Sequence, residues 1–145
     1  MGVLLLFNGG FILLSSIVSL IFNDGVTTEI FSAGVTVLIF GLILVFSTRN
    51  HEKQIQRREG YLIVTFGWLL MIFSGMLPYL FTETISEFSY AFFETTSGYT
   101  ATGSTILKDV ESLPKSIIFW RSTTHWIGGM GIIVLTIAIL PLLGV

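Results

Sequence analysis

The sequence lacks cysteine altogether and contains few charged residues. Without cysteine, the 145-residue chain can have no disulfide bond, no thiolate metal site and no cysteine nucleophile. Asp, Glu, Lys and Arg make up 11% of the chain, whereas soluble domains contain roughly 25%. No Lys or Arg precedes the first apolar run and no Ala-x-Ala site follows it, so we expect no cleaved signal peptide. The charge deficit indicates an integral membrane protein rather than a soluble domain.

Long apolar runs take the place of charge. Hydrophobic residues make up 52% of the sequence, and the mean hydropathy is +0.87. Four runs have about the length that a helix needs to cross a bilayer, roughly 20 residues: 1–22, 30–46, 61–81 and 113–143. We therefore predict an all-α integral membrane fold with four transmembrane helices, in which residues 1–46 form an N-terminal helix pair. Gly34 and Gly41 would let neighbouring helices approach closely.

The hydrophilic stretch 47–60 sets the predicted orientation. It contains four basic and two acidic residues: Arg49, Lys53, Arg57, Arg58, Glu52 and Glu59. The positive-inside rule places this loop and the N-terminus in the cytoplasm, and the region 82–113 outside. Arg57 and Arg58 also suit the binding of anionic lipid headgroups. On the outer side acidic residues outnumber basic ones, which would either concentrate cations near an entrance or simply be tolerated there.

A half-length helix and a polar loop separate the last two apolar runs. Thr84 and Glu87 have capping-box spacing and predict a helix over 84–97, too short to cross the membrane. The loop 98–105, Gly-Tyr-Thr-Ala-Thr-Gly-Ser-Thr, follows it. Polar loops at membrane depth are tolerated only where protein buries them or water reaches them, and rings of backbone oxygens can replace the water shell of potassium. The pattern predicts one quarter of a cation selectivity filter; the alternative is a flexible re-entrant loop without a chemical role.

Two charged residues near this loop each have two interpretations. Glu94 lies in the predicted half-helix, where a carboxylate is costly unless it is paired or hydrated. We expect it to have a structural partner in a loop or a neighbouring helix, with direct ion contact as the alternative. Arg121 lies in the first turns of the last apolar run. We expect its side chain to extend to the outer interface rather than to place a charge at a pore mouth.

The last apolar run also contains a glycine cluster and a histidine. Gly128, Gly129 and Gly131 are interpreted as a close-packing surface, with a hinge or ordinary membrane glycine as alternatives. His125 follows hydroxyl residues, but no nearby acid in the sequence orients it and no nucleophile motif is present. We therefore predict that the protein is not an enzyme.

Three segments resemble a known family of transporters. Residues 92–105, Phe-Phe-Glu-Thr-Thr-Ser-Gly-Tyr-Thr-Ala-Thr-Gly-Ser-Thr, resemble the first pore loop of the Trk/Ktr/HKT potassium transporter family. Residues 119–131, Phe-Trp-Arg-Ser-Thr-Thr-His-Trp-Ile-Gly-Gly-Met-Gly, resemble the helix that follows it in TrkH-like members, and so do residues 139–145, Ile-Leu-Pro-Leu-Leu-Gly-Val. Residues 1–46 are similar to the extra N-terminal helix pair of those members. The resemblance is thus to the N-terminal portion of a TrkH-like protein.

The resemblance implies four linked repeats of helix, pore loop and helix around one pore. Residues 61–145 would be the first repeat, with 61–81 as a helix, 84–97 as the pore helix, 98–105 as the filter and 113–143 as the second helix. The ion ligands would be chiefly backbone carbonyls from Thr100, Ala101, Thr102 and Gly103, with Gly103 as the key glycine. Ala101 stands where Thr is commoner, and His125 stands where many relatives have Gln, which leaves any hydrogen bond there open.

The implied function is potassium uptake across the inner or plasma membrane, with K⁺ bound in the filter. One repeat forms only one wall of a pore. The implied partners are therefore the lipid bilayer and the remaining three repeats or further copies of the chain, with a cytoplasmic ring of nucleotide-binding regulatory subunits; no nucleic acid is expected. The alternatives are a non-conducting helical membrane scaffold, which has no need of a Thr-Ala-Thr-Gly loop, and a truncated inactive fragment.

Overall fold

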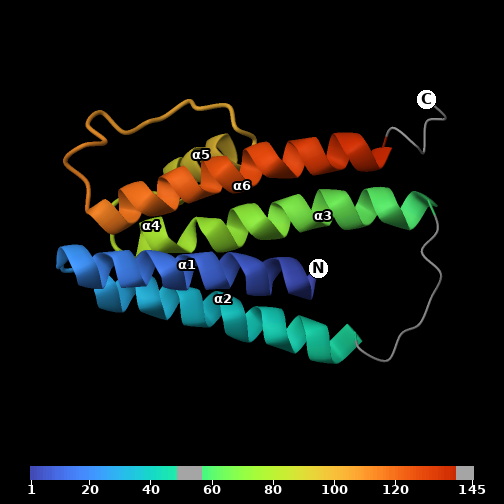
Figure 1. The fold of residues 1–145 in the computed structure, drawn as a ribbon, viewed down its shortest axis with the longest axis horizontal. Coiled ribbons are helices and arrows are strands. Elements are labelled where there is room, and N and C mark those ends of the chain that lie inside the picture. The colour runs from blue at the N-terminus through green and yellow to red at the C-terminus, as the bar shows by residue number, and fades with distance from the viewer. Residues whose placement is uncertain (49–56, 140–145) are drawn as a thin grey trace.

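Six helices build the part of the chain that the computed structural model describes, residues 1–48 and 57–139. They are α1 (Gly2–Phe22), α2 (Thr27–Thr48), α3 (Arg57–Gly75), α4 (Leu77–Phe81), α5 (Phe88–Tyr99) and α6 (Lys115–Ile139). Figure 1 shows α1, α2, α3 and α6 as long antiparallel rods, with α5 against α6. The predicted all-helical fold is confirmed. Most of the basic loop 47–60 and residues 140–145 lie outside the described residues.

Three stretches of the described chain are long and apolar enough to cross a membrane: Gly2–Phe22, Thr27–Thr48 and Leu62–Phe81. Large apolar side chains remain exposed on all three, among them Phe7, Phe40 and Phe66. Such surfaces suit contact with lipid tails. The fourth predicted span, 113–143, contains α6, whose 25 residues extend about 37 Å at 1.5 Å per residue. A membrane crossing by α6 stays a prediction.

Glycines bring α1 and α2 into close contact. A Cβ atom on Gly34 would lie 2.7 Å from Cδ2 of Leu13, and one on Gly41 would lie 3.0 Å from the amide nitrogen of Leu6. Close approach of this kind gains dispersion energy, which holds helices together where lipid surrounds them. The prediction that Gly34 and Gly41 permit close helix packing is confirmed.

The turn between α1 and α2 is fastened to the start of α6. The Asp24 carboxylate accepts hydrogen bonds from the Ser19 hydroxyl, from the Ser116 hydroxyl at 2.6 Å and from the Ser116 amide at 3.0 Å. Partial burial raises the pKa of Asp24, but these hydrogen bonds and one from the Val26 amide outweigh it. The pKa of Asp24 therefore lies below its ordinary value of 3.8.

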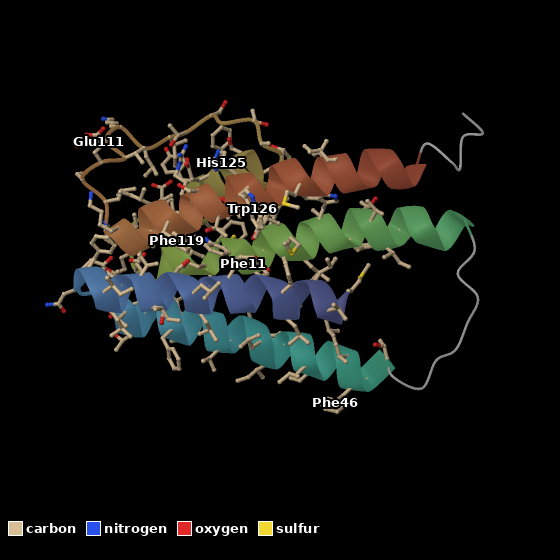
Figure 2. The ribbon with its side chains drawn as sticks, in the orientation of Figure 1. Phe11, Phe46, Glu111, Phe119, His125 and Trp126 are labelled. Atoms are coloured by element: carbon tan, nitrogen blue, oxygen red, sulfur yellow. The ribbon has the colours of Figure 1, made fainter. Side chains whose placement is uncertain are left out.

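The main core lies where α1, α2, α4 and α6 meet. Ile12, Ile30, Tyr79 and Trp120 are fully buried there. Beside this core, the ring of Phe11 packs edge-on against Trp126 of α6, with ring centroids 5.9 Å apart (Figure 2). The N-terminal helix pair is thus packed directly onto the rest of the chain.

The apolar stretch 61–81 is one predicted span but two helices. α3 ends at Gly75 and α4 begins at Leu77, with Pro78 in its first turn. Proline has no amide hydrogen to donate to the preceding turn, so the helix is interrupted before it. The free carbonyl of Gly75 accepts a hydrogen bond of 2.9 Å from the indole nitrogen of Trp120. The predicted span 61–81 thus corresponds to one candidate membrane stretch, Leu62–Phe81, which Met76 divides into two helices.

The predicted start of the half-length helix is wrong. α5 begins at Phe88, with Glu87 as its N-cap and no side-chain capping hydrogen bond. The Thr84 hydroxyl instead pairs with the Thr82 hydroxyl at 2.8 Å, so the expected capping box does not form. α5 has 12 residues and is about 18 Å long. It ends at Tyr99, two residues beyond the predicted end at 97.

Candidate functional site

The predicted ligands Thr100, Ala101, Thr102 and Gly103 lie together in an exposed loop at the C-terminal end of α5. The amides of Thr100, Ala101 and Thr102 donate hydrogen bonds of 2.9–3.0 Å to the carbonyls of Thr96, Gly98 and Ser97, in that order. The filter interpretation predicts an extended chain here, and this is wrong for Thr100 and Ala101, which form a turn. The reason is local bonding, because the Thr100 hydroxyl also donates to the Thr96 carbonyl, at 2.8 Å.

The carbonyl oxygens of the loop are free of the helix. None of the four carbonyls of Thr100–Gly103 accepts a hydrogen bond from any residue that the structure describes. Ala101 has φ 54° and Gly103 has φ 79°, so both lie in the left-handed region. A left-handed residue other than glycine costs about 1–2 kcal/mol, so the neighbouring contacts must hold Ala101 in place. The chain thus turns its backbone sharply here and leaves its oxygens available.

Glu94 holds the segment that follows Gly103. Its carboxylate is buried and accepts hydrogen bonds from the Thr105 hydroxyl at 2.9 and 3.0 Å and from the Ile106 amide at 3.1 Å. It also pairs with Arg121 of α6, whose Nε lies 2.8 Å from Oε1. A buried carboxylate needs partners of this kind to compensate for the water that it has lost. Glu94 therefore joins α5, α6 and the segment after the loop.

Two further contacts hold the loop. The buried Ser97 hydroxyl donates to the Ser104 carbonyl at 2.6 Å, so α5 is hydrogen-bonded to the residue directly after Gly103. A Cβ atom on Gly128 would lie 2.2 Å from the Tyr99 carbonyl oxygen, closer than any side chain allows. α6 therefore touches the backbone of α5 at its last residue. The loop is held on both sides while its own four residues stay exposed.

The side chain of Tyr99 points away from the loop and into the protein. It is fully buried, and its hydroxyl donates to Oδ1 of Asn8 at 2.6 Å. The Asn8 amide nitrogen donates to the Ser74 hydroxyl at 2.7 Å and lies 3.5 Å from the Met71 carbonyl. This network connects α1, α3 and α5, and its Asn8 and Ser74 lie in candidate membrane spans, where a buried amide needs such partners.

Comparison with known proteins identifies the chain. Residues 26–145 match the sequence model of the TrkH family, described as cation transport protein. This chain belongs to the TrkH family. A Trk system potassium uptake protein TrkH from Salmonella typhimurium is 41% identical over 148 aligned residues, which cover 99% of this chain and 30% of that protein. An uncharacterized cation transporter of Methanocaldococcus jannaschii is 38% identical, over 91% of this chain and 27% of that protein.

A solved TrkH structure has the same fold as this chain. The potassium transporter TrkH from Vibrio parahaemolyticus superposes with a TM-score of 0.91 and 37% sequence identity, covering 99% of this chain and 31% of that one. The family assignment confirms the resemblance found in the sequence, and the relatives are transport proteins rather than enzymes. The chain spans about 30% of the length of the relatives it matches.

The side chains around the loop Thr100–Gly103 confirm one prediction and contradict another. Glu94 has the structural partners that we predicted, but Arg121 turns inward to Glu94 instead of extending to the outer interface. Nδ1 of His125, a residue labelled in Figure 2, lies 2.9 Å from the Arg121 carbonyl. The hydroxyls of Ser122 and Thr124 each donate to a carbonyl of their own helix.

The glycine cluster is divided between two environments. Gly128 and Gly131 pack closely, because Cβ atoms there would lie 2.2 Å from the Tyr99 carbonyl and 3.3 Å from the Trp68 ring. A Cβ atom on Gly129 would meet nothing within 4 Å in the described chain. The packing prediction is confirmed for Gly128 and Gly131, and for Gly129 it stays a prediction, because Gly129 meets no described residue of this chain.

Sequence reasoning missed Asn8 and Ser97. Asn8 is the one amide side chain in the first apolar run, and a polar group in a membrane span is itself a signal of a specific partner. Its partner Tyr99 is 91 residues away, so no local pattern reveals the contact. Ser97 is a plain hydroxyl residue, and only the fold brings the Ser104 carbonyl within its reach.

Proposed function

We propose that this chain is the N-terminal portion of a potassium uptake protein of the cell membrane and supplies one quarter of its selectivity filter. The observation that carries the proposal is the loop Thr100–Gly103, whose carbonyls accept no hydrogen bond within the described chain. Buried contacts from Glu94, Ser97 and Gly128 hold both of its flanks. A fixed loop with free backbone oxygens is what a dehydrated potassium ion requires.

The ligands in this proposal are the backbone carbonyls of Thr100, Ala101, Thr102 and Gly103. Because the oxygens come from the backbone, alanine at 101 serves as well as threonine. The loop follows the C-terminal end of α5, where the helix dipole places partial negative charge and favours a nearby cation. The protein would bind and pass ions without covalent chemistry.

The proposed topology uses four membrane spans. The N-terminus and residues 47–60 lie in the cytoplasm, the filter loop faces outside, and α6 returns the chain to the inner side. The positive-inside bias of residues 47–60 supports this orientation. The Salmonella typhimurium relative is named a potassium uptake protein, which supports potassium as the ion.

One repeat cannot enclose an ion, so the proposal requires partners. Three further walls would come from three more repeats or from further copies of this chain. The chain spans about 30% of its relatives, which supports the first source. A cytoplasmic ring of nucleotide-binding subunits would regulate the assembled protein, and the lipid bilayer surrounds it.

The test is potassium uptake in a host that lacks its own potassium uptake systems. The chain is expressed alone and as a fusion to the part of the Vibrio parahaemolyticus relative that it does not cover. We expect the fusion to restore growth at low potassium and the chain alone not to. Rescue by the chain alone would show self-assembly around a pore. A fusion that reaches the membrane in normal amount but takes up no potassium would overturn the proposal in favour of a non-conducting scaffold.

A further inference from the structure

Tyr99 is the residue directly before the proposed filter, and its partner lies in a helix outside the helix–loop–helix repeat. The Tyr99 hydroxyl donates to Asn8 of α1 at 2.6 Å, and both side chains are fully buried. Asn8 in turn donates to the Ser74 hydroxyl of α3 at 2.7 Å. Both polar atoms of the Asn8 side chain thus have hydrogen-bond partners, and these partners lie in α3 and α5 rather than in α1.

The Tyr99 ring has no room to move without its neighbours. A Cβ atom on Gly75 would lie 2.6 Å from Cε2 of Tyr99 and 2.8 Å from its hydroxyl oxygen. On another side the Trp68 ring packs edge-on, with ring centroids 6.5 Å apart. At the other end of the residue, the Tyr99 carbonyl touches Gly128 of α6. A shift of the Tyr99 side chain would therefore be passed to its backbone, and the backbone continues into Thr100.

We propose that Asn8 is a positioning residue for the filter and acts through Tyr99. On this view the N-terminal helix pair sets the geometry of an ion site to which it contributes no ligand. A displacement of α1 relative to α3 would move the hydroxyl of Tyr99, tilt the last turn of α5 and alter the spacing of the carbonyls that follow. This inference rests on the proposed function, because it assumes that Thr100–Gly103 bind the ion.

The experiment uses the fusion protein with Asn8→Leu, with Tyr99→Phe and with both changes together. Ser15→Ala is the matched control, because Ser15 is a buried polar residue of α1 whose hydroxyl, among the described residues, bonds to the Phe11 carbonyl of the same helix. The first readout is the ratio of the half-saturating concentrations for sodium and potassium in tracer uptake. The second is hydrogen exchange of the Thr100, Ala101 and Thr102 amides in purified protein, which needs no transport.

We expect both single variants to lower the preference for potassium over sodium by about tenfold, equivalent to about 1.4 kcal/mol, the size of one hydrogen bond. Exchange of the three amides should rise by a similar factor, since all three are bonded to α5 carbonyls. Ser15→Ala should change neither value. The double variant removes both polar partners, and such a double replacement restores stability in many buried pairs. It still lacks the hydrogen bond between α1 and Tyr99, so it should keep the lowered preference for potassium over sodium.

Three outcomes would overturn the inference. The first is unchanged amide exchange at Thr100–Thr102 in both single variants. The second is an ion preference that returns to the wild-type value in the double variant. The third is that Ser15→Ala changes both readouts as much as Asn8→Leu does. The proposed function fails separately, through a wild-type fusion that takes up no potassium. In that case the exchange measurement still decides whether Asn8 positions the loop.

Discussion

The Nε atom of Arg121 in the second turn of α6 lies 2.8 Å from Oε1 of Glu94 in the middle of α5. The Glu94 side chain is fully buried, and that of Arg121 is 19% exposed. The same carboxylate accepts hydrogen bonds from Thr105 and Ile106, so one acidic group joins two helices to the segment after the loop. Removal of either member leaves a charge with fewer partners in a site that water hardly reaches.

Glu94→Ala should therefore destabilise the protein strongly. Loss of one member of a buried ion pair costs about 3–5 kcal/mol, and the Ile106 amide loses its acceptor as well. Glu94→Gln keeps one carbonyl oxygen and should lie between wild type and Glu94→Ala. Thermal unfolding of the purified protein in detergent measures both. Glu87→Ala is the control on the same helix, since Glu87 is exposed and makes no capping hydrogen bond; an equal loss there would contradict the prediction.

Gly128 and Gly129 offer a matched pair of substitutions. Gly128→Ala places a methyl group 2.2 Å from the Tyr99 carbonyl, and relief of such a clash in a packed contact costs about 1–3 kcal/mol. Gly129→Ala meets nothing in the described chain and gains up to about 1 kcal/mol of helix propensity. We expect a lower melting temperature for Gly128→Ala and an equal or higher one for Gly129→Ala. The opposite order would mean that the α5–α6 contact does not limit stability.

Ala101 and Gly103 both have left-handed backbones, but exchange of alanine and glycine should matter at Gly103 and be nearly neutral at Ala101. Gly103→Ala forces a side chain into φ 79°, which costs about 1 kcal/mol or more and shifts the carbonyls on either side. Ala101→Gly relieves the strain at φ 54° but adds freedom to the unfolded chain. In the fusion, Gly103→Ala should reduce the potassium preference in tracer uptake, and Ala101→Gly should leave the melting temperature within a few degrees of wild type. If Gly103→Ala transports with normal selectivity, Gly103 is not the key glycine of a filter.

Asp24 gives the stability a predictable dependence on pH. The hydrogen bonds from Ser116 and Ser19 outweigh its burial and lower its folded pKa below 3.8, whereas an unfolded Asp titrates near its ordinary value of about 3.9. This contribution to stability is present above about pH 4 and is lost as the pH falls through the folded pKa. Wild type should lose stability more steeply than Asp24→Asn below about pH 4 in a series of melting curves. Parallel curves for the two proteins would exclude a role for the Asp24 carboxylate.

Much of the fold could be predicted from local sequence. The predictions that were wrong also have local causes. The apolar runs gave the positions of α1, α2 and α6, since helix formation in lipid satisfies every backbone group within the segment. The break at Met76 was missed because apolar length alone does not show that Pro78 begins a second helix. The start of α5 was missed because Thr84 bonds to Thr82 instead of capping the helix.

Arg121 shows why the candidate site was harder to predict. By sequence alone, a charge in the first turns of a membrane helix is expected to extend to the interface. Its partner Glu94 is 27 residues away, and only the packing of α5 on α6 brings the two within 2.8 Å. Gly129 was grouped with Gly128 and Gly131 because spacing does not reveal which face of α6 touches Tyr99 and Trp68.

The sequence by itself determined that this is a helical membrane protein of the TrkH family, with a short helix and a Gly/Thr loop before its last helix. Apolar length and loop composition are local properties of the chain, and the lipid environment leaves few other solutions. The tertiary structure alone decided that Glu94, Ser97 and Gly128 contact the chain on either side of Thr100–Gly103, and that Asn8 bonds to Tyr99 directly before it. The contacts of Tyr99 with Asn8 and with Gly128 join residues far apart in sequence, so they exist only once the helices have packed.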